Sequence, residues 1–299
     1  MEQSYVIEAQ NINKSFKNFT LDIPEFKLPK GFATALIGEN GAGKTTLLNI
    51  LTGIRLDYKG NIRYFDKYTE KDINDIPDVK EKIGYTGTEN YFLPNWTVGQ
   101  VADISSIIFE KFDTSRFNKL CSDLAVFGSG DFDNKKRIHT LSDGTKTKLM
   151  LASVLARETD LLIMDEPASP LDPLMRDKLC ELIRDYLSSG EEKSVFFSTH
   201  NISDMESVTD YAIIMEHGKI VEQGFVEDLK EKYIVVKGES ADTSKAKPYL
   251  YTISETKYGF EGICLAENLD KLAGIDVVTE TPSLFKISVN VMKKNSLIK

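Results

Sequence analysis

The sequence has few cysteines and no long apolar run, and these two features limit the classes of protein to which it can belong. Its three cysteines, Cys121, Cys180 and Cys264, lie far apart without a CxxC spacing, so we expect reduced, buried thiols and neither disulfides nor a zinc site. The apolar runs are only a few residues long, far shorter than a membrane span. The opening stretch, MEQSYVIEAQ, has neither the basic flank nor the apolar core of a signal peptide. We therefore expect the chain to remain in the cytoplasm.

The chain also has fewer positively than negatively charged residues. The chain has 37 Lys and Arg against 46 Asp and Glu, which gives a net charge of −9. Because binding to a nucleic-acid backbone depends on clustered Lys and Arg, this balance predicts no nucleic-acid partner. The 299 residues are 41% hydrophobic and 28% charged, which is typical of one or two globular domains with hydrophobic cores.

The first half of the chain changes from strand patterns to helix patterns. One helix, residues 45–54, begins after a glycine-rich turn and ends near Gly53. Short alternating runs around it predict strands at 5–16, 19–26, 32–38 and 60–66. Further on, apolar side chains recur at helical spacing, which predicts helices within 98–112, 115–127 and 146–158.

The second half returns to strands and then changes once more. Apolar strands at 161–164, 194–198 and 211–215, with a helix at 173–188, have the alternation of a parallel α/β sheet. Near residue 236 the pattern breaks at GESADTSKAK, and two β-rich stretches follow, at 249–260 and 285–294. We therefore predict two domains, 1–231 and 232–299, and expect the second to be a small αβ domain after a linker.

The segment GENGAGKT, residues 38–45, lies between the strand FATALI and the helix TTLLNILTG. Glycines let such a loop turn so that successive N–H groups face phosphate oxygens at a helix N-terminus. In this pattern the lysine reaches the β and γ phosphates and the next hydroxyl binds magnesium. An ordinary glycine-rich turn is the alternative, and the strand–loop–helix order favours nucleotide binding. The predicted ATP-binding residues are Gly38, Glu39, Asn40, Gly41, Ala42, Gly43, Lys44, Thr45 and Thr46.

A second motif, LLIMDEP, ends a buried strand on two adjacent carboxylates, Asp165 and Glu166. Two like charges tolerate this position if their partners differ. A phosphate loop brings a divalent cation to the end of a neighbouring parallel strand, so we predict that Asp165, with Thr45, holds Mg²⁺. Glu166 would then face the γ-phosphate and polarise an attacking water. The alternative is a plain strand end, with both acids in solvent before Pro167.

Five elements, in order, resemble those of the ATP-binding-cassette (ABC) ATPases: GENGAGKT, LSDGT at 141–145, LLIMDEP, SPLD at 169–172 and STH at 198–200. The resemblance covers about residues 5–230. It implies an α/β fold with a P-loop NTPase core of ABC type, a helical subdomain at about 88–157, and a small C-terminal αβ domain as an appended piece. It also implies two cassettes that dimerise head to tail with ATP between them.

The same resemblance assigns further residues. Ser142, Asp143 and Gly144 occupy the signature that would contact ATP of the partner, and Asp172 the position of a dimer contact. His200 matches the switch histidine beside the γ-phosphate and, with Glu166, is a predicted catalytic residue; taken alone, it is a polar residue at a strand end, where α/β proteins bind ligands. Phe16 matches the aromatic residue placed against adenine, although a phenylalanine at a strand end is as often a core residue.

Two departures from the family pattern stand out. Where the family usually has a glutamine that senses magnesium, the sequence has Thr88 followed by Glu89. The signature reads LSDGT, with Asp143 where a glycine is usual and Thr145 where a glutamine is usual. A carboxylate 4 Å from a phosphate charge would be repelled by about 4 kcal/mol at an effective dielectric of 20. We therefore expect the Asp143 side chain to point away from the partner's nucleotide.

The resemblance implies an ATP-hydrolysing subunit of an ABC transporter, with ATP and Mg²⁺ as cofactors. Its partners would be a second ABC ATPase chain, identical or different, and integral membrane subunits at the inner face of the cell membrane. Export of a peptide or another amphipathic compound is the predicted task. The alternatives are a soluble ABC ATPase that acts on nucleic acid or ribosomes, and a regulatory module with low turnover.

Overall fold

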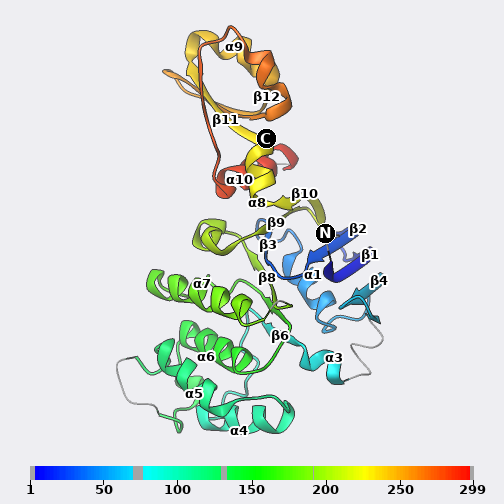
Figure 1. The fold of residues 1–299 in the computed structure, drawn as a ribbon, viewed down its shortest axis with the longest axis vertical. Helices are drawn as coiled ribbons and strands as arrows, with labels where there is room; N and C mark the ends of the chain where they lie inside the picture. Colours follow the sequence, from blue (N-terminus) through cyan, green and yellow to red (C-terminus); the bar gives the residue numbers. More distant parts are fainter. Residues whose placement is uncertain (1–3, 70–76, 129–132, 191, 297–299) are drawn as a thin grey trace.

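The computed structural model describes residues 4–69, 77–128, 133–190 and 192–296, and its centre is a six-stranded sheet (Figure 1). The strand order of this central sheet is β10-β9-β3-β8-β7-β6. All neighbours pair in parallel except β10, which is antiparallel to β9. The strands are β3 (Ala33–Ile37), β6 (Ile83–Thr86), β7 (Leu161–Met164), β8 (Ser194–Thr199), β9 (Tyr211–Glu216) and β10 (Lys219–Phe225).

Three interior strands of this sheet are buried along their whole length. Every residue of β3, β7 and β8 is buried, as expected for parallel strands covered on both faces. Because the strands are parallel, the residues that follow β3, β7 and β8 meet at one edge. That edge carries the glycine-rich loop, the acidic pair and His200, so the fold gathers three of the predicted motifs.

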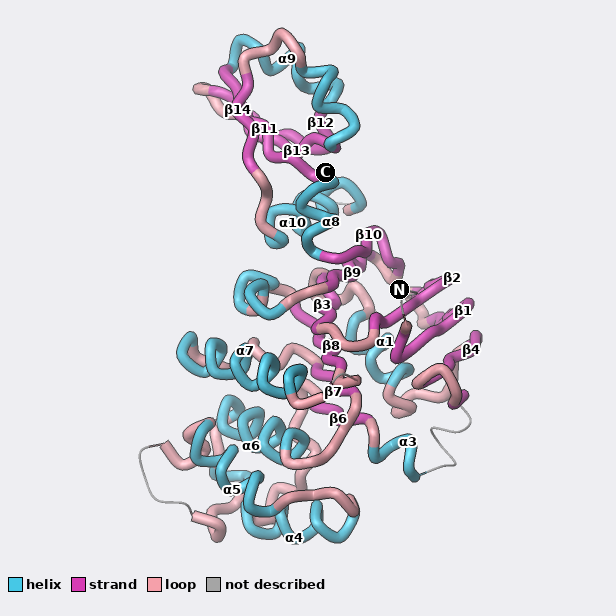
Figure 2. Tube along the Cα trace, in the orientation of Figure 1, coloured by secondary structure: helices cyan, strands magenta, loops and turns pink. Residues whose placement is uncertain are grey.

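An antiparallel sheet covers one face of the central sheet, with helix α1 (Lys44–Leu51) between them (Figure 2). Leu47 and Leu48 of α1 share a buried cluster with Ile7 and Ile23 of this N-terminal sheet and with Phe196 of β8. The strand order is β2-β1-β4-β5, and the strands are β1 (Tyr5–Ser15), β2 (Thr20–Pro29), β4 (Lys59–Tyr64) and β5 (Tyr68–Thr69).

Helices cover the other face and extend beyond the β6 edge (Figure 1). The helices predicted within 98–112, 115–127 and 146–158 are confirmed as α4, α5 and α6, and the one at 173–188 as α7. Thr97 forms a capping box with Gln100 at the start of α4. The bounds are α3 (Pro77–Glu81), α4 (Val98–Ile108), α5 (Thr114–Asp123), α6 (Asp143–Leu155), α7 (Pro173–Ser188), and the 3₁₀ helices η1 (Ile138–Thr140), η2 (Ile202–Asp204) and η3 (Glu206–Val208).

The C-terminal part forms a separate antiparallel sheet of order β12-β13-β11-β14. Helix α8 (Val226–Lys232) continues directly into β11 (Tyr233–Glu239). The prediction of a linker at GESADTSKAK, residues 238–247, is wrong, because those residues complete β11 and form short helices. The remaining elements are η4 (Ser240–Asp242), α9 (Thr243–Ala246), η5 (Lys247–Tyr249), β12 (Leu250–Glu255), β13 (Gly259–Leu265), η6 (Ala266–Leu272), β14 (Val277–Glu280) and α10 (Leu284–Asn295).

Helix α10 corrects a second expectation, because residues 285–294 were predicted to be β-rich. Its buried residues Leu284, Ile287, Ser288 and Val291 recur at helical spacing, and Ser283 caps it by accepting the N–H of Lys286 at 3.2 Å. The apolar members of this set belong to the main buried cluster of the chain. The last helix therefore packs on the part of the chain that contains the central sheet, between that part and the C-terminal sheet (Figure 1).

Two global features complete the fold. The three cysteines are free and buried, which confirms the prediction that these side chains are buried. Within the ranges given above, no helix combines the length and the apolar character needed to cross a membrane. The domain boundary at residue 232 stays a prediction.

Candidate functional site

The glycine-rich loop connects β3 to α1 and wraps around the lysine side chain. Gly41 and Gly43 have φ of 88° and 105°, a backbone region that favours glycine. A Cβ on Gly38 would lie 2.6 Å from the carbonyl oxygen of Met215 in β9, so only glycine fits there. Lys44 is 6% exposed, and its Nζ donates to the carbonyl oxygens of Gly38 at 2.8 Å and Glu39 at 3.3 Å. The loop thus holds the ammonium group of Lys44 against its own backbone carbonyl oxygens.

Thr45, the first residue after the lysine, contacts the first carboxylate of the acidic pair. Its Oγ1 donates to Oδ2 of Asp165 at 2.7 Å, and Asp165 is 2% exposed. The hydroxyl of Ser198, in β8, donates to the other oxygen of Asp165. The same Ser198 oxygen accepts the N–H of Glu166 at 2.9 Å. Sequence analysis placed Ser198 in the STH element but gave it no role, although it is the first polar residue after the apolar run VFF.

Glu166, the second carboxylate, is held by different partners from those of Asp165. Its φ is 51°, a strained value for a residue with a side chain. Oε2 lies 2.7 Å from Nδ1 of His200, and Oε1 lies 3.2 Å from Nζ of Lys44. The lysine contact is an ion pair without hydrogen-bond geometry, so Oε1 is buried with no hydrogen-bond donor among the described residues. An unsatisfied carboxylate oxygen can accept a hydrogen bond from water or ligand.

Two adjoining cavities surround these side chains. One of about 290 Å³ is lined by Phe19, Glu39, Asn40, Gly41, Gly43, Lys44, Thr45, Thr46, Thr88 and Glu166. The other, of about 320 Å³, is lined by Asn40, Thr86, Gly87, Thr88, Thr147, Asp165, Glu166, Pro167, Ser169, Pro170 and His200. The structure thus brings together most of the predicted P-loop residues, both acids and His200. Thr88 lines both cavities, whereas Glu89 lines neither.

Aromatic residues flank the P-loop on the side of the N-terminal sheet. Phe19 lines the P-loop cavity, and its Cζ would lie 2.7 Å from a Cβ on Gly43. Phe16 lies outside that lining and is 40% exposed, with its ring centroid 6.0 Å from that of Phe19. The guanidinium of Arg55 lies 5.3 Å from the Phe16 ring centroid. Sequence analysis selected Phe16 and missed Phe19, which is nearer to the loop in space.

The LSDGT segment forms the start of α6. Ser142 is its N-cap and accepts the N–H of Thr145 at 3.2 Å. The Asp143 side chain is 90% exposed and pairs with Lys146, one turn along the helix, at 2.9 Å. The hydrogen bond from Lys146 lowers the pKa of the Asp143 carboxyl. The carboxylate is therefore turned along its own helix, and the helix N-terminus faces outward.

The SPLD turn packs against this helix start. A Cβ on Gly144 would lie 2.7 Å from the carbonyl oxygen of Pro170, so the two backbones are in close contact. Asp172 is the N-cap of α7 and accepts the N–H of Met175 at 3.1 Å. Ser142, Asp143, Gly144 and Asp172 all lie outside the lining of the two P-loop cavities.

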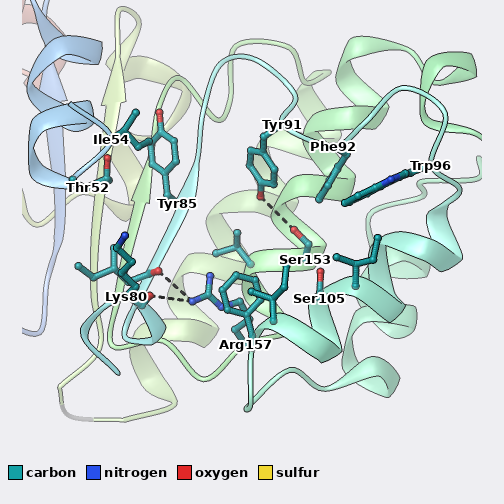
Figure 3. Close-up of a pocket in the computed structure, with 16 residues that line it drawn as sticks. Thr52, Ile54, Lys80, Tyr85, Tyr91, Phe92, Trp96, Ser105, Ser153 and Arg157 are labelled. Atoms are coloured by element: carbon teal, nitrogen blue, oxygen red, sulfur yellow. Dashed lines mark hydrogen bonds between the residues drawn. The ribbon is translucent and has the colours of Figure 1, made fainter. Parts of the chain in front are cut away.

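A third, mostly apolar cavity of about 460 Å³ opens between α1, β6 and the helices α4 and α6 (Figure 3). Its wall includes Tyr91, Phe92 and Trp96 from the loop after β6, and Ile108 of α4. Ile108 is 61% exposed. At the base, Nη2 of Arg157 donates to the carbonyl oxygens of Lys80 and Glu81. These contacts leave an apolar hollow with aromatic walls on the surface of the protein.

The residues at the P-loop fit a magnesium nucleotide. Hydroxyl and carboxylate oxygens are ligands that Mg²⁺ prefers, usually together with phosphate oxygens, and Thr45 and Asp165 present such a pair. In the part of the chain that the structure describes, no group of three or more His, Cys, Asp or Glu could hold a metal alone. A cation at this site would therefore need oxygens from the nucleotide. With this fold, the loop and the acidic pair define a P-loop ATPase.

Comparison with known proteins identifies the family. The family model described as ABC transporter matches residues 21–169. The energy-coupling factor transporter ATP-binding protein EcfA1 of Fusobacterium nucleatum is 31% identical over 231 residues, covering 73% of this chain and 82% of the relative. The chain belongs to the ABC transporter family, as one of its ATP-binding, ATP-hydrolysing subunits.

Two further likenesses are informative. The lantibiotic transport ATP-binding protein SrtF of Streptococcus pyogenes is 29% identical over 218 residues, covering 72% of this chain and 89% of the relative. A solved structure described as a dimeric post-hydrolysis state of an ATP-binding cassette, bound to ADP and Pi, aligns with a TM-score of 0.62 and 18% identity. That alignment covers 73% of this chain and 98% of the cassette, and it shows the shared fold.

Proposed function

We propose that this chain powers export of a peptide or another amphipathic compound through separate membrane subunits. The likeness to SrtF, whose name states lantibiotic transport, supports this class of cargo. The observation that carries hydrolysis is the pair Asp165 and Glu166, whose side chains are held by different partners at the P-loop. Such a division of partners lets one acid bind a cation while the other acts on water.

In this proposal, each residue at the P-loop has its own task. The loop amides and Lys44 bind the phosphates, and Thr45 and Asp165 would hold Mg²⁺. Bound magnesium would neutralise charge on the β and γ phosphates. Glu166 orients the attacking water through Oε1, the oxygen that has no donor among the described residues. His200, 2.7 Å from the other oxygen of Glu166, fixes the orientation of that carboxylate and reaches the γ-phosphate.

The outward-facing start of α6 gives a reason to propose a second chain. Ser142 and Gly144 lie at a helix N-terminus, which favours phosphate oxygens, yet they are outside the cavities of their own P-loop. We assign them, with Asp172, to contacts with a partner cassette and its ATP. Because Asp143 is turned toward Lys146, its carboxylate does not oppose the approach of that nucleotide.

The apolar cavity of Figure 3 is the proposed docking site for a membrane subunit. Its aromatic walls and the exposed Ile108 suit an apolar helical segment. Ile108→Glu should abolish stimulation of ATP hydrolysis by the membrane subunit and leave the basal rate of the isolated chain unchanged. Ile107→Glu is the matched control, since Ile107 is 81% exposed on the same helix but lies outside the cavity lining. Equal effects of both substitutions would rule out this docking site.

Hydrolysis is tested by phosphate release with magnesium ATP, with molar mass measured by light scattering on the same samples. The wild-type chain should release phosphate, whereas Glu166→Gln should not and should instead form an ATP-dependent dimer. Turnover by Glu166→Gln at the wild-type rate would refute the role of Glu166. If the wild-type chain is inactive alone and becomes active only with a different cassette, the homodimer is excluded and the role of Glu166 is tested in the mixed pair.

A further inference from the structure

The segment that follows His200 is joined to the last helix of the chain through one carboxylate. Glu206, in η3, accepts the N–H of Leu284 through Oε1 at 2.7 Å and the N–H of Phe285 through Oε2 at 3.3 Å. Both N–H groups belong to the first turn of α10, where backbone donors have no partner within the helix. A carboxylate there is favoured by the helix dipole. Glu206 therefore caps a helix that lies 78 residues further along the chain.

Apolar contacts strengthen this junction. Helix α10 packs against η2, the short helix between His200 and Glu206. The two segments share one buried cluster, to which α10 contributes Leu284, Ile287 and Val291, and the segment 201–208 contributes Ile202, Met205 and Val208. A displacement of α10 would therefore pull on both the carboxylate and the apolar side chains of the segment 201–208.

The other end of this segment is tied to the nucleotide site. The carboxylate of Asp204 accepts from Nη1 of Arg176 at 2.7 Å and from Nδ2 of Asn201 at 3.1 Å. Arg176, in α7, also donates from Nε to the carbonyl oxygen of Leu171, within the SPLD turn, at 2.9 Å. Asn201 directly follows His200. The segment 201–208 is thus held between α10 at one end and His200 at the other.

We propose that Glu206 is a positioning residue for hydrolysis. By capping α10, it fixes the segment 201–208 and, through Asp204 and Asn201, the placement of His200 against Glu166. The way in which the C-terminal sheet and α10 pack on the rest of the chain then sets the rate at which bound ATP is hydrolysed. This inference rests on the proposed function, in which His200 and Glu166 act at the γ-phosphate.

The chain offers a matched pair of substitutions. Glu206→Ala removes the cap that belongs to the segment 201–208, whereas Ser283→Ala removes the cap that belongs to α10 itself. Both weaken the same helix end, but only the first acts on His200. For Glu206→Ala of the full chain we expect kcat to fall about two- to thirtyfold, the range for residues that couple distant sites, with an unchanged KM for ATP. Ser283→Ala should keep the wild-type kcat.

A second readout does not depend on hydrolysis. The chain has three histidines, so the imidazole resonances of His200 can be assigned by NMR with a His200→Gln reference. Glu206→Ala should shift the His200 resonances and leave those of His139 in place, and Ser283→Ala should shift neither. If Glu206→Ala does not fold, Glu206→Gln, which keeps one acceptor oxygen, should give the same changes in smaller measure.

The two readouts separate failure of this inference from failure of the proposed function. If the wild-type chain hydrolyses no ATP while Glu206→Ala still shifts the His200 resonances, the coupling stands and the proposed function fails. If Glu206→Ala and Ser283→Ala lower kcat equally, or if neither Glu206 substitution moves the His200 resonances, Glu206 is only a structural cap and the inference is overturned.

Discussion

Removal of the Glu166 charge should tighten ATP binding while it stops hydrolysis. In the structure Oε1 of Glu166 lies 3.2 Å from Nζ of Lys44, and the side chains are 15% and 6% exposed. In the proposed function, a bound nucleotide draws Lys44 toward its phosphates and leaves Glu166 facing their negative charge. Glu166→Gln removes both the competing ion pair and the repulsion.

The size of the effect follows from that distance. Two unit charges 3.2 Å apart attract each other by about 5 kcal/mol at an effective dielectric of 20. Desolvation of both groups offsets much of this attraction, and Lys44 keeps its two backbone acceptors. We expect a net gain of about 1.4 kcal/mol, which is roughly tenfold in Kd.

The assay is calorimetric titration with a non-hydrolysable ATP analogue and magnesium, at a protein concentration where the chain is monomeric by light scattering. Glu227→Gln is the control for net charge, because its side chain is 83% exposed and lies outside the linings of the P-loop cavities. Equal affinities for the wild type and both variants would show that Lys44 is not engaged by Glu166 in solution.

Three further outcomes are expected. Gly144→Ala places a Cβ 2.7 Å from the Pro170 carbonyl oxygen and should lower the free energy of unfolding, measured by thermal unfolding, by about 1–3 kcal/mol. Gly190→Ala is the control: the nearest atom that its Cβ would meet is 3.6 Å away, so the free energy of unfolding should change by less than about 0.5 kcal/mol. Burial raises the pKa of the Cys121 thiol to about 12, so native protein at pH 8 should not react there with a thiol reagent, and labelling before unfolding would contradict this. Glu216 is 4% exposed, its Oε2 has no hydrogen-bond partner in the described ranges, and burial raises its pKa. The wild-type chain therefore loses stability as the pH rises from the usual carboxyl pKa to this raised value, and Glu216→Gln should add about 1 kcal/mol to the free energy of unfolding at pH 7.5 but little at pH 4. An equal gain at both pH values would show that ionisation of Glu216 is not the cause.

Local patterns were sufficient for the centre of the site. The strand before the acidic pair is apolar throughout and the strand before GENGAGKT is apolar except for Thr34, and each is followed by residues that an apolar strand does not carry without a partner. Because both strands pair in parallel with β8, their ends lie at the same edge of the sheet, and Thr45 and Asp165 are in contact there at 2.7 Å. Ser198 could not be selected in the same way, because its two contacts depend on the register of β8 beside β7.

The C-terminal part was predicted less well because its secondary structure depends on contacts with residues far away in the sequence. The stretch FKISVNVMKK alternates apolar and polar residues as a strand does, yet it folds as α10. The helix is favoured by packing of its buried face on the core and by the carboxylate of Glu206, a contact from 78 residues away that leaves no sign in the sequence near residue 285. Tertiary contacts of this kind override weak local preferences. Similarly, the nearness of Phe19 to Gly43 depends on how the N-terminal sheet lies on α1.

The left-handed backbone of Glu166 has a consequence for the evolution of the chain. A non-glycine residue in a strained backbone region costs about 1–3 kcal/mol, and the φ of 51° at Glu166 lies in that region. Glycine or asparagine at this position would relax the turn and stabilise the fold. A screen of random variants for heat resistance alone should therefore recover such replacements and lose turnover with them, since stability and activity are in conflict at this residue. The chain keeps an unfavourable conformation at the position where the proposed chemistry needs a carboxylate.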